Sequence, residues 1–290
     1  MVVPCFHASI SFFLLGICAA FPAPQVSRVL DLAPLCSSPG GDGTTSTERV
    51  PWEFTRFLSQ SVRFVSPPSL LPPMPATAVP PGGIIWSPSA RASSSFGNWA
   101  PLDDVVMGGA SKSVFSRDGY WSGTVTEANS GGFVGIRTLP LGRKSRALDL
   151  SGCSGLEITL SVPDNTDMKR RFKFVVRDST DFNGVCWTSS FEIDPSKLKN
   201  AGGWPMSLRK DTTVGEIGDE SNKSQCTTIK VPFDKQVPTI FANTIQGKTF
   251  KKNNVVGLQL AYSKFEYDGG LNPNFSTGDF AIRVEKIRSY

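Results

Sequence analysis

Histidine is almost absent from this chain of 290 residues. The single histidine, His7, lies in an N-terminal stretch that has the features of a targeting sequence. A mature chain without histidine cannot build a Ser-His-Asp or Cys-His nucleophile system, and it cannot hold zinc or iron through imidazole. General acid or base chemistry would then depend on carboxylates, lysines or tyrosines. This scarcity argues against most hydrolase classes.

Cysteines are few in the part of the chain that we expect to fold. Six are present, but the ones beyond the first 36 residues are Cys153, Cys186 and Cys226. An odd number without C-x-x-C spacing predicts neither a disulfide framework nor a cysteine-rich metal site. We expect buried free thiols in a reducing compartment.

Long apolar runs and strong charge are lacking as well. Beyond the N-terminus, no apolar run reaches the ~20 residues that a membrane-spanning helix requires. The formal net charge is +5, and the basic residues are scattered apart from short clusters such as residues 169–171. A nucleic-acid partner is therefore not expected, and any association with a membrane would be peripheral.

The N-terminal 50 residues have the composition of a targeting region. Residues 1–20 combine an apolar stretch with small residues at its end, as a signal peptide does, and residues 21–50 are rich in Ser, Pro and Thr, as transit peptides are. The junction CAAFPAP resembles the bipartite plastid presequences of algae with secondary plastids, in which Phe21 would follow the cut. We therefore predict a plastid protein; the secretory pathway and the mitochondrion are the alternatives.

Two further segments precede the main domain. Residues 51–66 place Phe54, Phe57 and Leu58 three and four positions apart, which predicts a short amphipathic helix. Residues 67–96 are dense in proline and show no helix or strand period, so we expect an extended and partly disordered linker.

From residue 97 to residue 290 the sequence changes to short alternating segments. Apolar residues recur at every second position, and Gly, Asn, Asp and Pro separate the segments, which is typical of antiparallel sheet. Many such strands with almost no helical period predict an all-β domain, a β-sandwich of the jelly-roll type. The segments that we interpret as strands are 120–128, 131–139, 156–162, 172–178, 186–193, 227–233, 255–262 and 279–287.

The stretch LDDVVMGGASKSVF contains adjacent carboxylates, Asp103 and Asp104, followed by Gly108 and Gly109. If both aspartates lay on a strand, they would point to opposite faces and could not easily share a substrate. A structural corner, in which one aspartate accepts backbone N–H groups and the glycines permit positive φ, is the simplest interpretation. A surface for a partner or ligand is the second, and catalysis or metal binding is the third.

Arg137 lies within an otherwise apolar strand and therefore needs a partner. A bidentate bond to Asp103 or Asp104 would tie two strands together. The alternative is contact with an anion or a partner protein.

Two other groups could form ligand sites. Trp121, Trp187 and Trp204 could stack on a sugar, although core packing is the more common role of tryptophan in a sandwich. The second group consists of Glu266, Asp268 and Asn272, which lie in a predicted loop. These residues could coordinate calcium or simply form a hairpin turn. Either Glu266 or Asp268 could also supply a second carboxylate to a glycosidase, as Glu127 could.

Four blocks of sequence carry a family resemblance. They are W-x-x-L-D-D-V-V-M-G-G-A-S from Trp99 to Ser111, G-T-V-T-E-A-N-S-G-G-F-V-G-I-R-T from Gly123 to Thr138, K-V-P-F from Lys230 to Phe233, and A-Y-S-K-F-E-Y-D-G-G-L-N-P-N-F from Ala261 to Phe275. Together they resemble the thirty-kilodalton complex I intermediate-associated protein family, and the last block looks more like its plastid-type branch. The resemblance implies a galactose-binding-like jelly roll.

The resemblance also implies a function, namely a non-catalytic assembly factor for a membrane-bound electron-transfer complex. Its partners would be subunits or assembly intermediates of that complex, photosynthetic or respiratory. Plastid relatives also carry a dinucleotide-binding fold, but no G-x-G-x-x-G follows a strand here, so we assign no cofactor, metal or catalytic residue. A module that binds carbohydrate or a small ligand is the alternative, and a carboxylate-based glycosidase or a reductase is the third.

Overall fold

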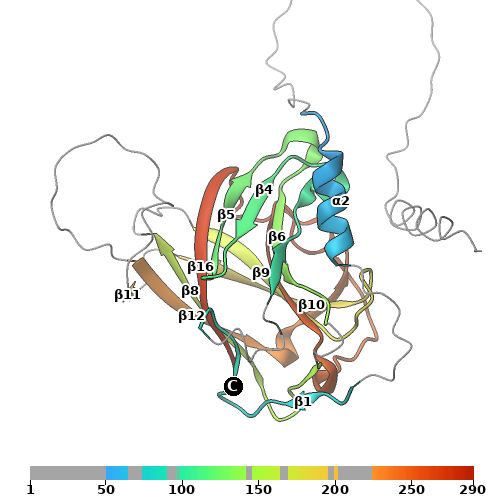
Figure 1. The fold of residues 1–290 in the computed structure, drawn as a ribbon, viewed down its shortest axis with the longest axis vertical. Coiled ribbons are helices and arrows are strands. Elements are labelled where there is room, and N and C mark those ends of the chain that lie inside the picture. The colour runs from blue at the N-terminus through green and yellow to red at the C-terminus, as the bar shows by residue number, and fades with distance from the viewer. Residues whose placement is uncertain are drawn as a thin grey trace, which may run out of the picture. The chain divides into compact units, whose positions relative to one another are not determined.

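The computed structural model describes residues 50–64, 74–89, 96, 98–141, 146–163, 169–194, 199–201 and 224–290 (Figure 1). The predicted signal peptide and nearly all of the transit-like segment lie outside these residues, as does Trp204.

One sheet of the domain has seven described strands, and all of its pairings are antiparallel. Alternate residues of β9 and β15 face the core, where Phe172, Phe174 and Leu260 are fully buried. In spatial order the strands are β14 (Asn243–Thr244), β13 (Val237–Ile240), β10 (Cys186–Ile193), β9 (Arg170–Arg177), β15 (Gly257–Ser263), β6 (Phe133–Thr138) and β3 (Trp99–Pro101).

The second sheet is built around β16, the longest strand, which pairs with both β8 and β5. Its pairings are antiparallel too. The strands in spatial order are β11 (Lys199–Ala201), β12 (Ser224–Pro232), β8 (Gly155–Pro163), β16 (Gly278–Ser289), β5 (Tyr120–Val125) and β4 (Lys112–Phe115), and β2 (Ile84–Trp86) also pairs with β16.

The two sheets pack against each other and enclose one apolar core. Trp121 of β5 contacts Phe172 of β9 at 6.1 Å between ring centroids, and Tyr262 of β15 contacts Phe280 of β16 at 6.2 Å. Each of the eight predicted strand segments overlaps a strand of these sheets. The predicted jelly-roll β-sandwich is therefore confirmed.

The proline-dense segment differs from the expectation of a linker. Strand β1 (Thr77–Ala78) pairs in parallel with β7 (Leu148–Asp149), and β2 places Trp86 in the core with 1% of its surface exposed. The linker prediction was wrong for this part of residues 67–96. A strand of three residues between prolines is too short to show a period of two, so its sequence pattern could not reveal it.

Helix α2 (Phe54–Arg63) lies within the segment predicted to be helical and runs beside the sandwich (Figure 1). It buries Phe57 and is followed by the buried Phe64. Of the helices described, none has the length and apolar character to cross a membrane.

Candidate functional site

The two adjacent aspartates lie at a tight corner, which we call the aspartate corner (residues 103–113). A 3-10 helix, η1 (Asp104–Met107), follows Asp103 directly, so the two carboxylates do not lie on a strand. Gly108 ends η1 with a φ of 93°, a conformation that favours glycine, and the N–H of Gly109 donates to the carbonyl of Asp104 at 2.9 Å. The interpretation as a structural corner agrees with this geometry.

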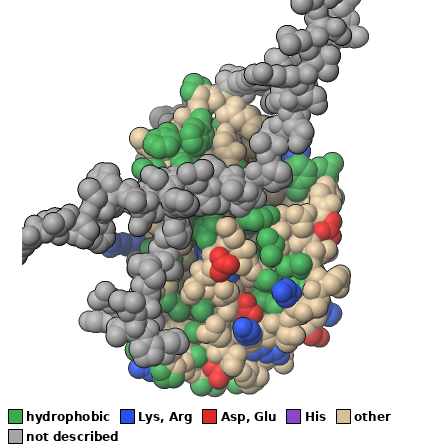
Figure 2. Space-filling view, turned by 90° about the vertical axis from the view of Figure 1, so that its right-hand side faces the viewer, with side chains coloured by type: hydrophobic (Ala, Val, Ile, Leu, Met, Phe, Trp, Pro, Cys, Tyr) green, Lys and Arg blue, Asp and Glu red, His purple; other side chains and the backbone are tan. Residues whose placement is uncertain are grey.

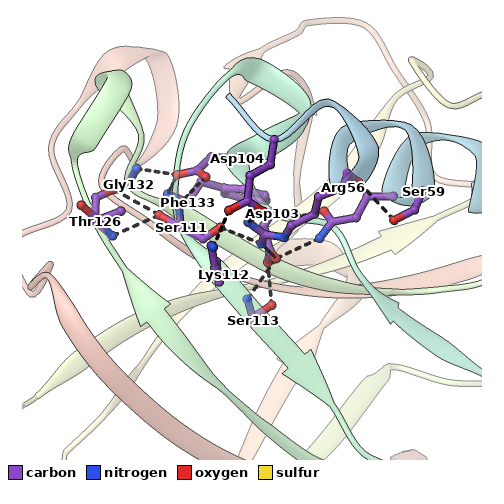
Figure 3. A network of polar contacts seen from close by, with 12 residues as sticks. Arg56, Ser59, Asp103, Asp104, Ser111, Lys112, Ser113, Thr126, Gly132 and Phe133 are labelled. Carbon is purple, nitrogen blue, oxygen red and sulfur yellow. Dashed lines mark hydrogen bonds and ion pairs between the residues drawn. The ribbon is translucent and has the colours of Figure 1, made fainter. Parts of the chain in front are cut away.

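The side chain of Asp104 holds the corner to the start of β6 (Figure 3). Its carboxylate accepts the backbone N–H groups of Ser111 at 2.9 Å, Gly132 at 2.9 Å and Phe133 at 3.2 Å. Gly109 must be small here, because a Cβ atom on it would lie 2.3 Å from Cγ of Asp104. Asp104 is buried, and its carboxylate bonds only to the protein's own backbone among the described residues.

The side chain of Asp103 holds helix α2 to strand β4 (Figure 3). Its carboxylate accepts hydrogen bonds from Arg56 Nη2 at 2.7 Å, from Gln60 Nε2 at 3.0 Å, and from Ser113 through the backbone N–H at 3.0 Å and the hydroxyl at 2.5 Å. The backbone N–H of Asp103 donates to Oε1 of Gln60 at 2.8 Å. Arg56 also donates to the carbonyl of Ser111 at 2.7 Å.

Burial governs the electrostatics of Asp103, which has no exposed surface. Desolvation raises the pKa of its carboxyl, and the hydrogen bonds from Ser113 and Gln60 and the charge of Arg56 oppose that rise. Because both aspartates are buried and bonded to the protein, neither presents a carboxylate at the surface for a substrate or a partner.

Arg137 does not pair with either aspartate, so that prediction was wrong. Its guanidinium lies over the rings of Phe64, at 5.5 Å, and Phe182, at 5.2 Å from the ring centroids. Asp103 is instead paired with Arg56, which belongs to a helix that the sequence pattern could not link to the corner. Such aromatic contacts stabilise a cation by roughly 0.5–2 kcal/mol, less than burial of an unpaired charge costs.

Two of the three tryptophans that were candidates for sugar stacking, Trp121 and Trp187, are structural, and the third, Trp204, lies outside the described residues. Trp121 and Trp187 are buried in the core, which leaves neither ring as a surface platform. Trp99, which opens the first sequence block, packs its ring against Trp86 at 5.9 Å and Phe115 at 6.0 Å. These tryptophans therefore hold the sandwich together.

The polar residues of the C-terminal loop bond to separate partners. Glu266 pairs with Arg171 at 3.2 Å and accepts a bond from Ser190 at 2.6 Å, whereas Asp268 accepts the N–H of Thr244 at 2.7 Å.

Asn272 donates to the carbonyls of Arg171 and Ser263. Within the part of the chain that the structure describes, no three acidic, cysteine or histidine side chains are grouped as metal ligands. Glu127 forms an ion pair with Lys264 at 2.9 Å.

Helix α2 carries an apolar face that the sequence analysis did not single out. Phe54, Leu58 and Val62, spaced by four, are 54%, 38% and 59% exposed, and Trp52 beside them is 49% exposed. Their spacing places them on one side of the helix. The indole N–H of Trp52 donates to the carbonyl of Val105 at 3.1 Å, which fixes the aromatic end of this face against η1. We call these four residues the apolar stripe of α2.

The face on the right of Figure 1, where α2 lies, shows groups of hydrophobic side chains among polar ones (Figure 2). The signal that could have identified the stripe is the helical pattern itself. Phe57, Ser61 and Phe64 form the buried side of the segment, so the remaining apolar residues must face outward.

Comparison with solved structures gives β-sandwich proteins of low similarity. A family 11 carbohydrate-binding module from Clostridium thermocellum, solved with a β-1,3-1,4-mixed-linked tetrasaccharide, is 17% identical, with 66% of this chain and 88% of that chain covered and a TM-score of 0.34. An exo-β-agarase is 11% identical, with 72% and 25% covered and a TM-score of 0.35. Likenesses of this strength carry no argument about a ligand. No curated protein matches the sequence.

A family match is more specific. The sequence model of the family described as complex I intermediate-associated protein 30 (CIA30) matches residues 89–215. This range includes the aspartate corner and Arg137, and it overlaps two of the blocks that carry the resemblance. Residues 89–215 of the chain are therefore similar to the complex I intermediate-associated protein 30 family.

Proposed function

We propose that the protein is a non-catalytic assembly factor that docks a subunit or intermediate of a membrane-bound electron-transfer complex on the apolar stripe of α2. The family match supports the type of client, because the family is named for its association with complex I intermediates. The burial of both aspartates supports a non-catalytic role for the stretch that first suggested an active site.

The observation that carries the proposal is the outward apolar face of a fixed helix. Two of the four side chains of the stripe are aromatic, and the rings of Trp52 and Phe54 contact each other at 5.6 Å. Exposed apolar groups of this kind mark interaction sites, and buried aromatic anchors supply most of the binding free energy at protein interfaces. An amphipathic helix that lays such a face into an apolar groove is a recurring mode of recognition.

The aspartate corner explains why this helix can act as a fixed docking element. Asp103 bonds Arg56 and Gln60 on the inner side of α2, so the helix is held to β4 while its outer side stays apolar. A helix that is already ordered loses less conformational entropy on binding than a helix that folds on contact.

The client that fits this surface is a subunit that exposes an apolar groove before its final partner covers it. The composition of residues 1–50 supports a plastid location. In that compartment the client would belong to a photosynthetic electron-transfer complex rather than a respiratory one, as the resemblance to the plastid-type branch also suggests.

Affinity purification of the tagged protein from its own cells tests this function. Leu58→Glu places a charge on the stripe, and Thr55→Glu places the same charge on an exposed position beside it. We expect the wild type and Thr55→Glu to recover subunits of an electron-transfer complex and Leu58→Glu to lose at least tenfold of them. Equal recovery by both variants, or recovery of secreted glycoproteins alone, would overturn the proposal.

The same tagged cells report the compartment. Fluorescence that coincides with the plastid supports the predicted presequence, and fluorescence in the secretory pathway or the mitochondrion contradicts it.

A further inference from the structure

A small cavity lies where strands β6 and β9 end. Two arginines line it, Arg137 and Arg177, together with the hydroxyl-bearing residues Thr138, Ser179 and Thr180. Its volume of about 10 Å³ gives room for roughly one water-sized group. Two arginines and three hydroxyl-bearing residues therefore line a space that admits about one oxygen atom.

Arg177 is held firmly, but its hydrogen bonds go to neutral groups. Nη1 donates to Sγ of Cys186 at 2.7 Å, and Nη2 donates to the carbonyls of Asp181 and, at 3.2 Å, Phe182. Its Nε is buried and has no hydrogen-bond partner, although only 3% of the residue is exposed. A buried donor without an acceptor costs about 1–3 kcal/mol, and more when the group is charged.

Arg137 is buried to a similar degree, with 6% of its surface exposed. It lies between the rings of Phe64 and Phe182, which satisfy the faces of the guanidinium but none of its in-plane N–H donors. Burial, with the positive charge of Arg177 nearby, lowers the pKa of Arg137 to about 9. The group is thus charged at neutral pH, and its charge is destabilised by what surrounds it.

No carboxylate of the described residues forms an ion pair with either of these arginines. The half-buried Arg56, by contrast, is paired with Asp103. The buried Arg170 and Lys173 donate to the carbonyls of Asp279, at 2.8 Å, and Phe265, at 2.5 Å, as Arg177 donates to carbonyls. The negative charges of Asp279 and Glu266 nevertheless act on these two groups and oppose the fall of their pKa that burial causes, and no carboxylate in the described part of the chain acts in this way on Arg137. Two like charges kept together without an acid suggest that an anion from outside completes the arrangement.

We propose that Arg137 and Arg177 form a binding site for a single carboxylate group. A carboxylate presents two oxygens in a plane and matches the paired N–H donors of a guanidinium, whereas the cavity is too small to enclose the four oxygens of a phosphate. The hydroxyl of Thr138 accepts the N–H of Leu258 at 3.0 Å, so its own hydrogen is available to the carboxylate. The site does not depend on the apolar stripe of α2.

Thermal unfolding in acetate tests the site with the simplest carboxylate. Replacing chloride by acetate at constant ionic strength raises Tm of the wild type saturably, by roughly 3 °C at ten times the dissociation constant. Arg137→Met and Arg177→Met each abolish this rise. Arg170→Met, on the opposite face of the same strand as Arg177, retains it and serves as the matched control.

Three results would overturn the proposal. One is an equal acetate effect on Tm in the wild type and in Arg137→Met, and another is no effect in the wild type. The third is a larger stabilisation by inorganic phosphate than by acetate that also requires Arg137. Circular dichroism of each variant shows whether it is folded, and where Arg137→Met does not fold, Arg177→Met gives the same readout.

The carboxylate could belong to an acidic side chain of a protein or to a small carboxylic acid, and a peptide distinguishes these two sources. A capped peptide with one glutamate, compared with its glutamine counterpart, binds at least tenfold tighter than acetate if the natural ligand is an acidic side chain of a protein. An affinity equal to that of acetate, still lost in Arg137→Met, identifies a small carboxylic acid. Glutamate and glutamine peptides that bind alike, with no effect of acetate, contradict the site.

Discussion

Asp103 and Arg137 are both buried charges, yet Asp103 accepts four hydrogen bonds whereas Arg137 contacts two aromatic rings. Asp103 bonds to Arg56 of α2, and Arg137 contacts Phe64, the residue that follows α2. The aspartate corner receives its counterion, Arg56, from within the chain, and the arginine pair Arg137–Arg177 does not receive one from the described residues.

This difference separates a structural charge from a candidate binding charge. A charge whose partners all come from the same chain makes folding specific, because removing any partner leaves another group unpaired. A charge surrounded only by rings, hydroxyls and a second like charge costs stability in the free protein, and an external ligand can recover that cost. The following predictions test the contrast, from the largest expected effect to the smallest.

The largest effect is expected from Asp103→Ala. The change leaves Arg56, Gln60 and Ser113 without their common acceptor inside the fold. We expect the free energy of unfolding to fall by about 3–5 kcal/mol, as measured by urea denaturation. Asp118→Ala, at an exposed position, should change it by less than about 0.5 kcal/mol. A loss below about 1 kcal/mol for Asp103→Ala would mean that the corner does not hold α2.

Glycine substitutions at the same corner distinguish the cost of a steric clash from the cost of an unfavourable backbone conformation. Gly109→Ala drives a Cβ atom into the Asp104 side chain, so we expect a cost of about 2–3 kcal/mol. Gly108→Ala meets no atom within 4 Å but must keep a φ of 93°, which costs about 1–2 kcal/mol. The unfolding free energies of the two variants give the comparison, and a reversed order would contradict the packing of Asp104 against Gly109.

Arg137→Met should act in the opposite direction to Asp103→Ala. It removes a charge that has no acid beside it and keeps an apolar group between Phe64 and Phe182. In a buffer without carboxylates we expect the unfolding free energy to stay the same or to rise by about 1 kcal/mol. A loss of more than about 2 kcal/mol in urea denaturation would show that Arg137 is structural, like Asp103.

The last prediction concerns ligand binding rather than stability, and its variable is pH. Because Arg137 is protonated below its pKa of about 9, acetate affinity should be constant between about pH 6 and pH 8 and fall about tenfold by pH 10. Arg177 and Cys186 also face this group, so Cys186→Ser is the control for titration of the thiol. Affinity measured by NMR titration that rises toward pH 10 would contradict a cationic site.

Much of this architecture could be predicted from the sequence, because it depends on local patterns. The alternation of Leu156, Ile158 and Leu160 specifies a strand with one buried face, and these residues are fully buried in β8. Asp-Asp followed by Gly-Gly indicates a corner for the same local reason. The strand at Trp86 was missed, since three residues contain no period.

The partners of the charges could not be predicted, because they depend on contacts between distant segments. Arg56 and Asp103 are 47 positions apart, and nothing local relates them. Arg137 needed a partner on electrostatic grounds, and Asp103 was the natural choice only while α2 was treated as a separate segment. The exposure of Leu58 likewise depends on a distant contact, because Asp103 bonds the opposite side of α2 and so turns Leu58 outward.

The guanidinium resonances of the arginines give the most direct test of the contrast between the two regions. In an acetate titration followed by NMR of the Nε–H groups, the account predicts saturable shifts for Arg137 and Arg177 and none for Arg56, which is bonded to Asp103. Equal shifts of all three, or shifts of Arg56 alone, would contradict it.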